Sequence, residues 1–208
     1  MHRTTRRPLR YWAIPSRTES VARRGPAWGV ANQGISGNRI LNDGFGTNAL
    51  ARFDRDILAL PGIKAVIVFE GVNDLGIGFG AMAQGQAAAM RTALPGGAIT
   101  AADLIAGYRQ IIARAHAKGV RIFGATIAPY KGATYWSEAG EAARQEVNRF
   151  IRTSGAFDAV LDFDKVLADP ADPAAMRTDY HMGDHLHGTD AGYKALADSI
   201  DLGLFKDD

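Results

Sequence analysis

The sequence of 208 residues contains no cysteine, and its longest uninterrupted apolar run is only Ala65–Phe69. Without cysteine there is no disulfide framework, no zinc–thiolate site and no thiol nucleophile. A run of this length is far below the ~20 apolar residues that a membrane-spanning helix needs. The remaining composition, 47% hydrophobic and 22% charged, is typical of one globular domain and excludes a disordered chain, a collagen and a coiled coil.

Positive charge is concentrated at the start of the chain. Residues 1–25 contain seven arginines and one acidic residue, so their net charge is +6, and the rest of the chain is at −4. Such a basic segment can bind nucleic acid or an anionic membrane, but its only aromatic residues are Tyr11 and Trp12, so we expect no nucleic-acid partner. Its apolar stretch Leu9–Ile14 is interrupted by Arg10 and stopped by Pro15, so no signal peptide is expected within the printed sequence.

Past residue 25, short apolar runs alternate with segments of helical periodicity. This alternation predicts an α/β domain with a doubly wound parallel sheet, and wholly apolar strands are typical of a sheet covered on both faces. The predicted strands are Trp28–Ala31, Ala65–Glu70, Val120–Ile127 and Ala159–Phe163.

Helix starts are marked by residues that cap helices well. Thr100 with Asp103 forms the pattern of a capping box, and Ser137 precedes another apolar repeat. Gly119 and Gly155 follow two of the segments, as glycines at helix C-termini do. The predicted helices are Ser16–Arg24, Asn48–Leu60, Ala101–Lys118, Glu138–Thr153 and Ala191–Leu204, the last capped by Thr189 or Asp190.

One stretch, Leu75–Gly97, breaks this rhythm because it is rich in Gly, Ala, Gln and Met. A connection of this length either shapes a binding site or is a surface insertion without a function. Ala81–Leu94 could form a short helix within it. Because the sequence has no internal repeat and no low-complexity linker, we expect one domain at residues 26–208, preceded by the basic segment 1–25 with the first helix.

Polar residues follow two of the predicted strands, where open α/β sheets place their sites. The first such segment is Asn32–Arg39, in which Gly34 and Gly37 allow a tight turn and a close approach of backbone N–H groups to a ligand. A glycine turn after a strand is also common without any function. The second segment is Glu70–Asp74, in which Asn73 could donate to an oxyanion, or could simply end the strand in an Asx-turn.

The third polar segment is His181–His187, just ahead of the last predicted helix. Asp184 and His187 are three residues apart, so the carboxylate could hold the imidazole in one tautomer and leave its other nitrogen as a general base. The clustered histidines also allow a metal site formed by His181, Asp184, His185 and His187. Acid–base chemistry is the favoured interpretation because the sequence has no further cluster of ligands; a purely structural role is the third alternative.

Taken together, Gly37, Asn73, Asp184 and His187 resemble the site residues of the SGNH or GDSL-type hydrolases. The resemblance covers residues 26–205 and appears as three blocks in the family's order: Asn32 to Gly37, Gly71-Val72-Asn73-Asp74, and Asp184 to His187. It implies a flavodoxin-like three-layer α/β/α sandwich that hydrolyses carboxylic esters without a cofactor. The substrates it implies are short acyl esters or acetyl esters of carbohydrates.

The same resemblance implies a role for each matching residue. The Gly37 N–H and the Asn73 side chain would form two-thirds of an oxyanion hole. His187 would be the general base, and Asp184 would orient it. The family's third oxyanion donor is the backbone N–H of its nucleophilic serine.

The family's first block, a buried strand followed by Gly-Asp-Ser, has no counterpart in the sequence. None of the six serines follows Gly-Asp; they are Ser16, Ser20, Ser36, Ser137, Ser154 and Ser199. Ser36 is nearest to a site block, but as part of a tight turn it is a poor substitute. No nucleophile is therefore assigned within this chain.

Tyr11 and Trp12, followed by the helix Ser16–Arg24, resemble the family's first helix after the serine loop. On that resemblance the nucleophile would fall a few residues before Met1, so we expect a truncated or mis-started chain that lacks the first central strand. Loss of that strand would leave the domain marginally stable, and loss of the serine would leave it inactive or nearly so.

Two other interpretations remain open. In one, the chain is a non-catalytic relative that binds a carbohydrate or another small ligand; in the other, it is a metal-dependent phosphoesterase that uses the histidine cluster. The partner expected on the main interpretation is a small-molecule or carbohydrate ester, and the sequence does not define an oligomeric state. We further expect Arg39 to pair with Asp43 or Asp74, and His116 to lie at the surface.

Overall fold

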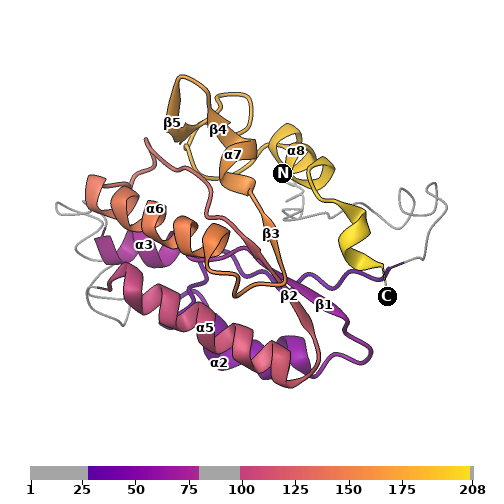
Figure 1. Cartoon of the computed structure of the whole chain (residues 1–208). Helices are drawn as coiled ribbons and strands as arrows, with labels where there is room; N and C mark the ends of the chain where they lie inside the picture. The colour runs from indigo at the N-terminus through magenta and orange to yellow at the C-terminus, as the bar shows by residue number, and fades with distance from the viewer. Residues whose placement is uncertain (1–27, 80–98, 207–208) are drawn as a thin grey trace, which may run out of the picture.

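The computed structural model describes residues 28–79 and 99–206. At its centre is a parallel sheet of three strands, β1 (Ala65–Val68), β2 (Arg121–Ala125) and β3 (Ala159–Leu161), in the order β1-β2-β3 (Figure 1). These are three of the predicted strands with shorter bounds, so the predicted parallel sheet is confirmed.

Side chains alternate between the two faces of this sheet, as they must in a strand. Val68 and Ile122 belong to one hydrophobic core cluster, and Ala125 and Leu161 to the other. Both faces are therefore covered, which explains why the strands are apolar throughout.

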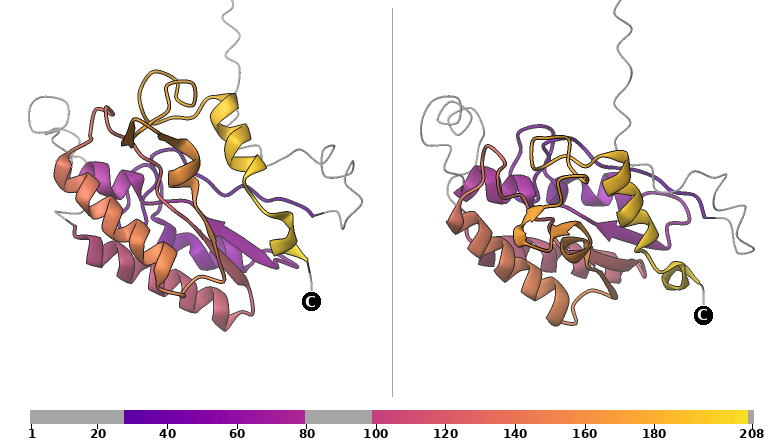
Figure 2. Two further views of the ribbon diagram at one scale, coloured as in Figure 1. Left: turned by 45° about the horizontal axis from the view of Figure 1, so that its top comes forward. Right: turned by 90° about the horizontal axis from the view of Figure 1, so that it is seen from above.

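Helices cover each face (Figures 1 and 2). The larger cluster lies under helices from the first three-quarters of the chain, and the smaller cluster lies under the C-terminal helices. The result is the predicted three-layer α/β/α arrangement. The first group consists of α2 (Ala49–Phe53), the π-helix η1 (Asp54–Leu58), α3 (Val72–Phe79), α5 (Ala101–Ala117) and α6 (Glu138–Thr153); the second is α7 (Phe163–Leu167) and α8 (Asp190–Asp198), followed by the 3-10 helix η2 (Leu202–Phe205).

The predicted helix caps are formed. Thr100 accepts a hydrogen bond from the Asp103 amide while the Asp103 carboxylate accepts one from the Thr100 amide, which completes a capping box. Ser137 caps α6 through the Gly140 amide. Gly119 and Gly155 follow α5 and α6 with φ of +67° and +65°, a conformation that glycine adopts without strain.

The predicted strand Trp28–Ala31 is wrong. These residues have no regular secondary structure, and Val30 is 54% exposed. Among the described residues β1 pairs with β2 alone, and no described strand pairs with this segment. An apolar, β-prone sequence becomes a strand only when a neighbour pairs with it.

Several elements were missed or misjudged in the sequence. The stretch Leu75–Gly97 begins inside a helix, α3, which its glycines at 76 and 78 disguise because glycine is a poor helix former. α7 and a short antiparallel hairpin, β4 (Ala168–Asp169) and β5 (Asp172–Met176), follow β3. The predicted last helix ends early, at Asp198.

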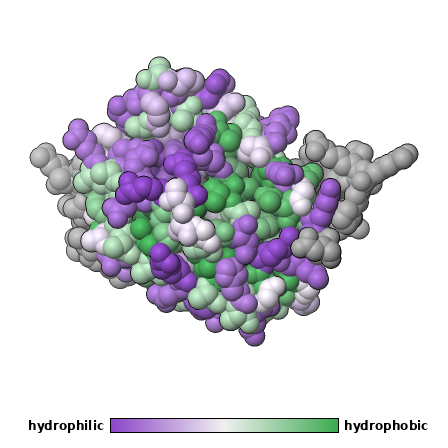
Figure 3. All heavy atoms as spheres, viewed as in Figure 1, coloured by the Kyte–Doolittle hydropathy of each residue, from purple (hydrophilic) through white to green (hydrophobic). Residues whose placement is uncertain are grey.

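The proposed helices Ser16–Arg24 and Ala81–Leu94 lie outside the described residues. No helix within residues 28–79 or 99–206 is long and apolar enough to cross a membrane. On the face shown in Figure 3, hydrophobic side chains gather toward the middle and hydrophilic ones surround them.

Candidate functional site

The turn that contains Gly37 requires glycine. Its φ is +77°, and a Cβ at this position would lie 2.7 Å from the Phe45 ring. The Asn38 amide closes the turn by donating to the Ile35 carbonyl at 3.1 Å. Because glycine has no side chain, the backbone of Gly37 is left partly exposed at this tight turn.

Asn73 lies in the first turn of α3, just past the end of β1, and it joins this strand end to the glycine turn. Its Nδ2 donates to the Asn38 carbonyl at 3.0 Å, and its Oδ1 accepts from the Tyr135 hydroxyl at 3.2 Å. These contacts argue against the Asx-turn alternative, in which the side chain would bind its own backbone. A side-chain amide has two N–H groups, so a second donor is available beside Gly37.

Asp74 clamps the segment that follows the glycine turn. Its two carboxylate oxygens accept from the amides of Ile40 and Leu41 at 2.8 and 3.1 Å. Burial raises the pKa of Asp74 to about 6, although these hydrogen bonds and the nearby Arg39 act in the opposite direction. Arg39 itself donates to the backbone carbonyl of Asp43, and burial lowers the pKa of Arg39 against the opposite effect of the charges of Asp74 and Asp43.

Arg52 supports the same turn from α2, and sequence reasoning missed it. Its Nε and Nη2 donate to Asn38 Oδ1 at 3.1 and 2.9 Å, and its Nη1 donates to the Gln33 carbonyl at 2.6 Å. The side chain is buried. A single arginine within a helix gives no sequence signal for a contact to residues so far away along the chain.

Glu70 lies two residues past the end of β1, and burial raises the pKa of its carboxyl by more than the nearby charge of Arg52 lowers it. Burial raises its pKa to about 8, and the nearby Asp74 charge adds to the effect. Its Oε1 has no hydrogen-bond partner among the described residues, whereas its backbone carbonyl accepts from Tyr108 at 2.6 Å. A pKa in this range favours the neutral acid near pH 7.

Asp184 and His187 form a hydrogen-bonded pair. His187 Nδ1 lies 2.6 Å from Asp184 Oδ2, and Asp184 Oδ1 accepts from the amides of Leu186 and His187 at 3.0 and 2.9 Å. Partial burial alone would raise the pKa of Asp184, but these hydrogen bonds lower it. An ionised carboxylate on Nδ1–H leaves Nε2 of the neutral ring as the proton acceptor.

The alternative metal site at His181, Asp184, His185 and His187 is not formed. Within the part of the chain that the structure describes, no three histidine, aspartate or glutamate side chains are placed to hold a metal ion. The ring centroids of His181 and His185 lie 4.3 Å apart, and the two ring planes are tilted by 33°. His181 Nδ1 instead lies 3.0 Å from the Gly183 amide, which donates to it.

Tyr135 contacts the Asn73 side of the candidate site. Its hydroxyl binds Asn73, and burial raises its pKa, to which the charges of Tyr130 and Asp184 add. Its ring packs so tightly on Gly76 that a Cβ there would lie 2.0 Å away. Tyr130 is fully buried and belongs to the core rather than to an open pocket.

The four serines among the described residues lie at helix ends or in a turn. Ser137 caps α6 and its hydroxyl donates to the Phe79 carbonyl at 2.8 Å, and Ser154 and Ser199 close the C-termini of α6 and α8. Ser36 is exposed in the glycine turn. Ser16 and Ser20 lie outside the described residues.

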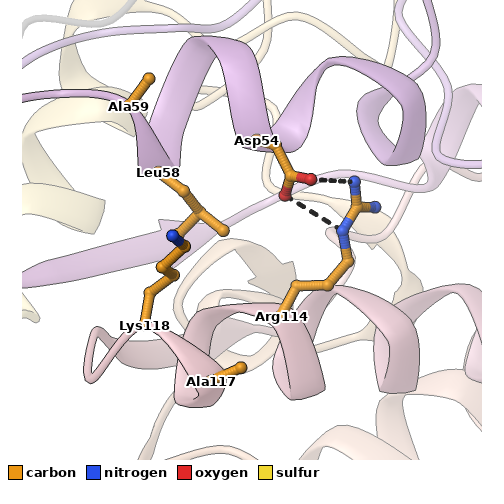
Figure 4. Close-up of a pocket in the computed structure, with 6 residues that line it drawn as sticks. All are labelled: Asp54, Leu58, Ala59, Arg114, Ala117 and Lys118. Atoms are coloured by element: carbon orange, nitrogen blue, oxygen red, sulfur yellow. Dashed lines mark hydrogen bonds and ion pairs between the residues drawn. The ribbon is translucent and has the colours of Figure 1, made fainter.

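A surface pocket of about 340 Å³ lies elsewhere, between η1 and the C-terminal end of α5 (Figure 4). An ion pair from Arg114 to Asp54, at 3.1 Å, crosses one side of it. It contains none of the candidate site residues, and two of the charged groups that line it, Asp54 and Arg114, pair with each other. Its lining is Asp54, Leu58, Ala59, Arg114, Ala117 and Lys118.

A family model described as the GDSL-like lipase/acylhydrolase family matches residues 8–195. No curated protein matches the chain by sequence. A solved structure of a GDSL-like lipase from Bacteroides thetaiotaomicron is 17% identical, with a TM-score of 0.57 over 75% of this chain and 68% of that one.

A protein of Bacteroides fragilis described as an acylhydrolase is 16% identical, with a TM-score of 0.57 over 75% of this chain and 67% of that one. A protein of Desulfitobacterium hafniense described as lipolytic and of the G-D-S-L family is 18% identical, with a TM-score of 0.51 over 73% and 70% of the two chains. At these identities the solved structures establish the shared fold.

Proposed function

Because the chain belongs to the GDSL-like lipase/acylhydrolase family, a family of ester hydrolases, we propose that its site serves the hydrolysis of short acyl esters or of acetyl esters on carbohydrates. The observation that supports this most is the placement of Asn73. Its amide is fixed by the Asn38 carbonyl and by Tyr135, next to the Gly37 turn. The loop that carries Asp184 and His187 packs its His185 ring on Gly132, three residues before Tyr135.

Each residue has one role in this proposal. The Gly37 N–H and the second Asn73 N–H stabilise the oxyanion that develops when an acyl carbon is attacked. His187 Nε2 takes the proton from the attacking hydroxyl and returns it to the leaving alcohol. Asp184 keeps His187 in the required tautomer and stabilises its protonated form. Water then repeats the cycle and releases the acid.

The proposal assigns no attacking hydroxyl within the 208 residues. No serine in the 208 residues follows Gly-Asp, and in a serine hydrolase the loss of the nucleophile costs on the order of 10⁶ in turnover. We therefore propose that the 208-residue chain alone hydrolyses esters very slowly. We also propose that residues 26–208 form one domain of this fold.

The test uses two proteins. One is the 208-residue chain, and the other, called the extended protein, is the same chain extended at its N-terminus by a β-strand that ends in Gly-Asp-Ser. Each is assayed with p-nitrophenyl acetate and treated with a serine-directed fluorophosphonate, after circular dichroism has shown that it is folded. We expect turnover and labelling in the extended protein alone. Turnover should be lost in its Asn73→Ala and His187→Ala variants and kept in Asp198→Ala, an exposed change on α8.

Two outcomes would contradict the proposal. A folded extended protein that is neither labelled nor active removes the ester-hydrolase assignment. If the 208-residue chain hydrolyses the ester at a normal enzymatic rate, the claim that it lacks the nucleophile is wrong.

The absence of Gly-Asp-Ser also supports a second candidate, a non-catalytic protein that binds an acylated carbohydrate. Here Asn73 and His187 would only hydrogen-bond the ligand. Calorimetric titration of the 208-residue chain with an acetylated xylo-oligosaccharide tests this. Binding that is lost in Asn73→Ala, without any release of acetate by the extended protein, favours this second candidate.

A further inference from the structure

The loop that contains Asp184 and His187 is closed on itself. His181 and Gly188 form an isolated antiparallel bridge, and the Met182 amide donates to the His187 carbonyl at 2.9 Å. His181 is buried, with 7% of its surface exposed. It therefore occupies the base of the loop rather than its surface.

His181 Nδ1 accepts two hydrogen bonds from inside this loop. The donors are the backbone amides of Gly183, at 3.0 Å, and of His185, at 3.3 Å. A ring nitrogen accepts only when it has no proton, so the ring is neutral with its hydrogen on Nε2. The two donor residues flank Asp184 in the sequence.

The loop needs such a fixing point because its backbone is in an unusual conformation. Gly183 has φ of +93° and His185 has φ of +59°. For a residue other than glycine this region is sparsely populated, and it persists only where surrounding contacts enforce it. The His185 ring packs over Gly132, where a Cβ would lie 2.8 Å from it, which leaves it little room to move.

We propose that His181 is a positioning residue for the Asp184–His187 pair: its imidazole Nδ1 fixes the amides on both sides of Asp184 and so sets the direction of that carboxylate. With those amides held, Asp184 Oδ1 receives the Leu186 and His187 amides while Oδ2 faces His187 Nδ1. Burial and the neighbouring His185 lower the pKa of His181, against the opposite effect of Asp184, which keeps the acceptor form present at neutral pH.

The role of the pair in ester hydrolysis rests on the proposed function, but the positioning can be measured without substrate. The variants are His181→Asn, whose side-chain oxygen can accept at the Nδ1 position, and His181→Phe, which keeps a buried ring and removes the acceptor. His116→Phe, an exposed histidine on α5, is the matched control. The readouts by NMR are the Nδ1–H signal of His187 and the hydrogen-exchange rates of the Gly183 and His185 amides.

We expect His181→Phe to lose the His187 Nδ1–H signal and to speed exchange of the two amides by about tenfold, the equivalent of one lost hydrogen bond. His181→Asn should keep the signal and stay within about threefold of the original rates. Should His181→Phe not fold, a His181→Asn protein that loses the signal still overturns the proposal, and one that keeps it supports acceptor-based positioning.

The proposal also fails if His181→Phe leaves the signal and both exchange rates unchanged. Failure of the proposed function looks different. In that case the Nδ1–H signal responds to His181 as described, but the extended protein with Gly-Asp-Ser hydrolyses no ester.

Discussion

Single charged side chains fix the candidate site by binding backbone and side-chain groups that are distant in the sequence. Asp74 binds the amides of Ile40 and Leu41, and Arg52 binds Asn38 and the carbonyl of Gln33. In each case one charged group receives or donates several hydrogen bonds, which are stronger than those between neutral groups. The glycine turn therefore stays in place without a strand of its own among the described residues.

Glu70 allows a prediction of pH dependence. Because its pKa is raised to about 8 in the folded protein, folding favours the protonated acid, so its contribution to stability is full below the ordinary carboxyl pKa of ~4.3 and is lost as pH rises through about 8. Each unit of the shift corresponds to about 1.4 kcal/mol. Glu70→Gln, which is always neutral, should therefore become more stable than the original protein as pH rises.

Urea unfolding at about pH 4 and about pH 9 measures this difference. The free energies of the two proteins should be close at the lower pH, and Glu70→Gln should be the more stable by several kcal/mol at the higher pH. Glu146→Gln, an exposed change on α6, is the control and should follow the original protein. Equal stabilities of Glu70→Gln and the original protein at both pH values would contradict the prediction.

At the scale of elements, α6 and α7 are joined to the end of β2 by a buried charge network. Arg144 is completely buried, and its guanidinium pairs with Asp164 of α7 and with Glu141 one turn away. It also donates to the Ile127 carbonyl just past β2 at 2.9 Å. Burial of this arginine is tolerated because every side of its guanidinium meets an acceptor.

Removal of one partner should therefore be costly. We expect Asp164→Ala to lower the free energy of unfolding by about 3 kcal/mol, at the lower end for a broken buried pair because Glu141 remains. Asp172→Ala breaks the exposed pair with Lys131 and should cost less than about 1 kcal/mol. Denaturant unfolding of both variants checks this, and equal losses would show that the buried network adds nothing beyond a surface ion pair.

Elements with local signals could be predicted from the sequence, and those that depend on distant partners could not. The caps at Thr100 and Ser137 need only a few neighbouring residues, so α5 and α6 were predicted to within a residue. Trp28–Ala31 has the composition of a strand. A segment becomes a strand only when a neighbouring strand pairs with its backbone, and no described strand pairs with this one.

The same distinction applies to the candidate site. The spacing of Asp184 and His187 already indicates their contact because three residues bring them within one turn of chain. The contacts of Tyr135 and Arg52 join segments up to 62 residues apart, and no local pattern marks them. Whether Gly37, Asn73 and His187 act together on one substrate stays a prediction until the extended protein is assayed.

At the scale of the whole molecule, the two hydrophobic clusters share one sheet, so we predict that residues 26–208 unfold as one cooperative unit. Leu104 belongs to the cluster under α5 and Phe163 to the cluster on the opposite face. Leu104→Ala should cost about 2–5 kcal/mol and Phe163→Ala about 3–5 kcal/mol. Because adjacent side chains of the same strands enter both clusters, each change should lower the midpoint of a single transition. Urea unfolding, followed by circular dichroism and by tryptophan fluorescence, measures the number of transitions and their midpoints. Two separate transitions, each shifted by only one of the variants, would show that the two faces of the sheet fold independently.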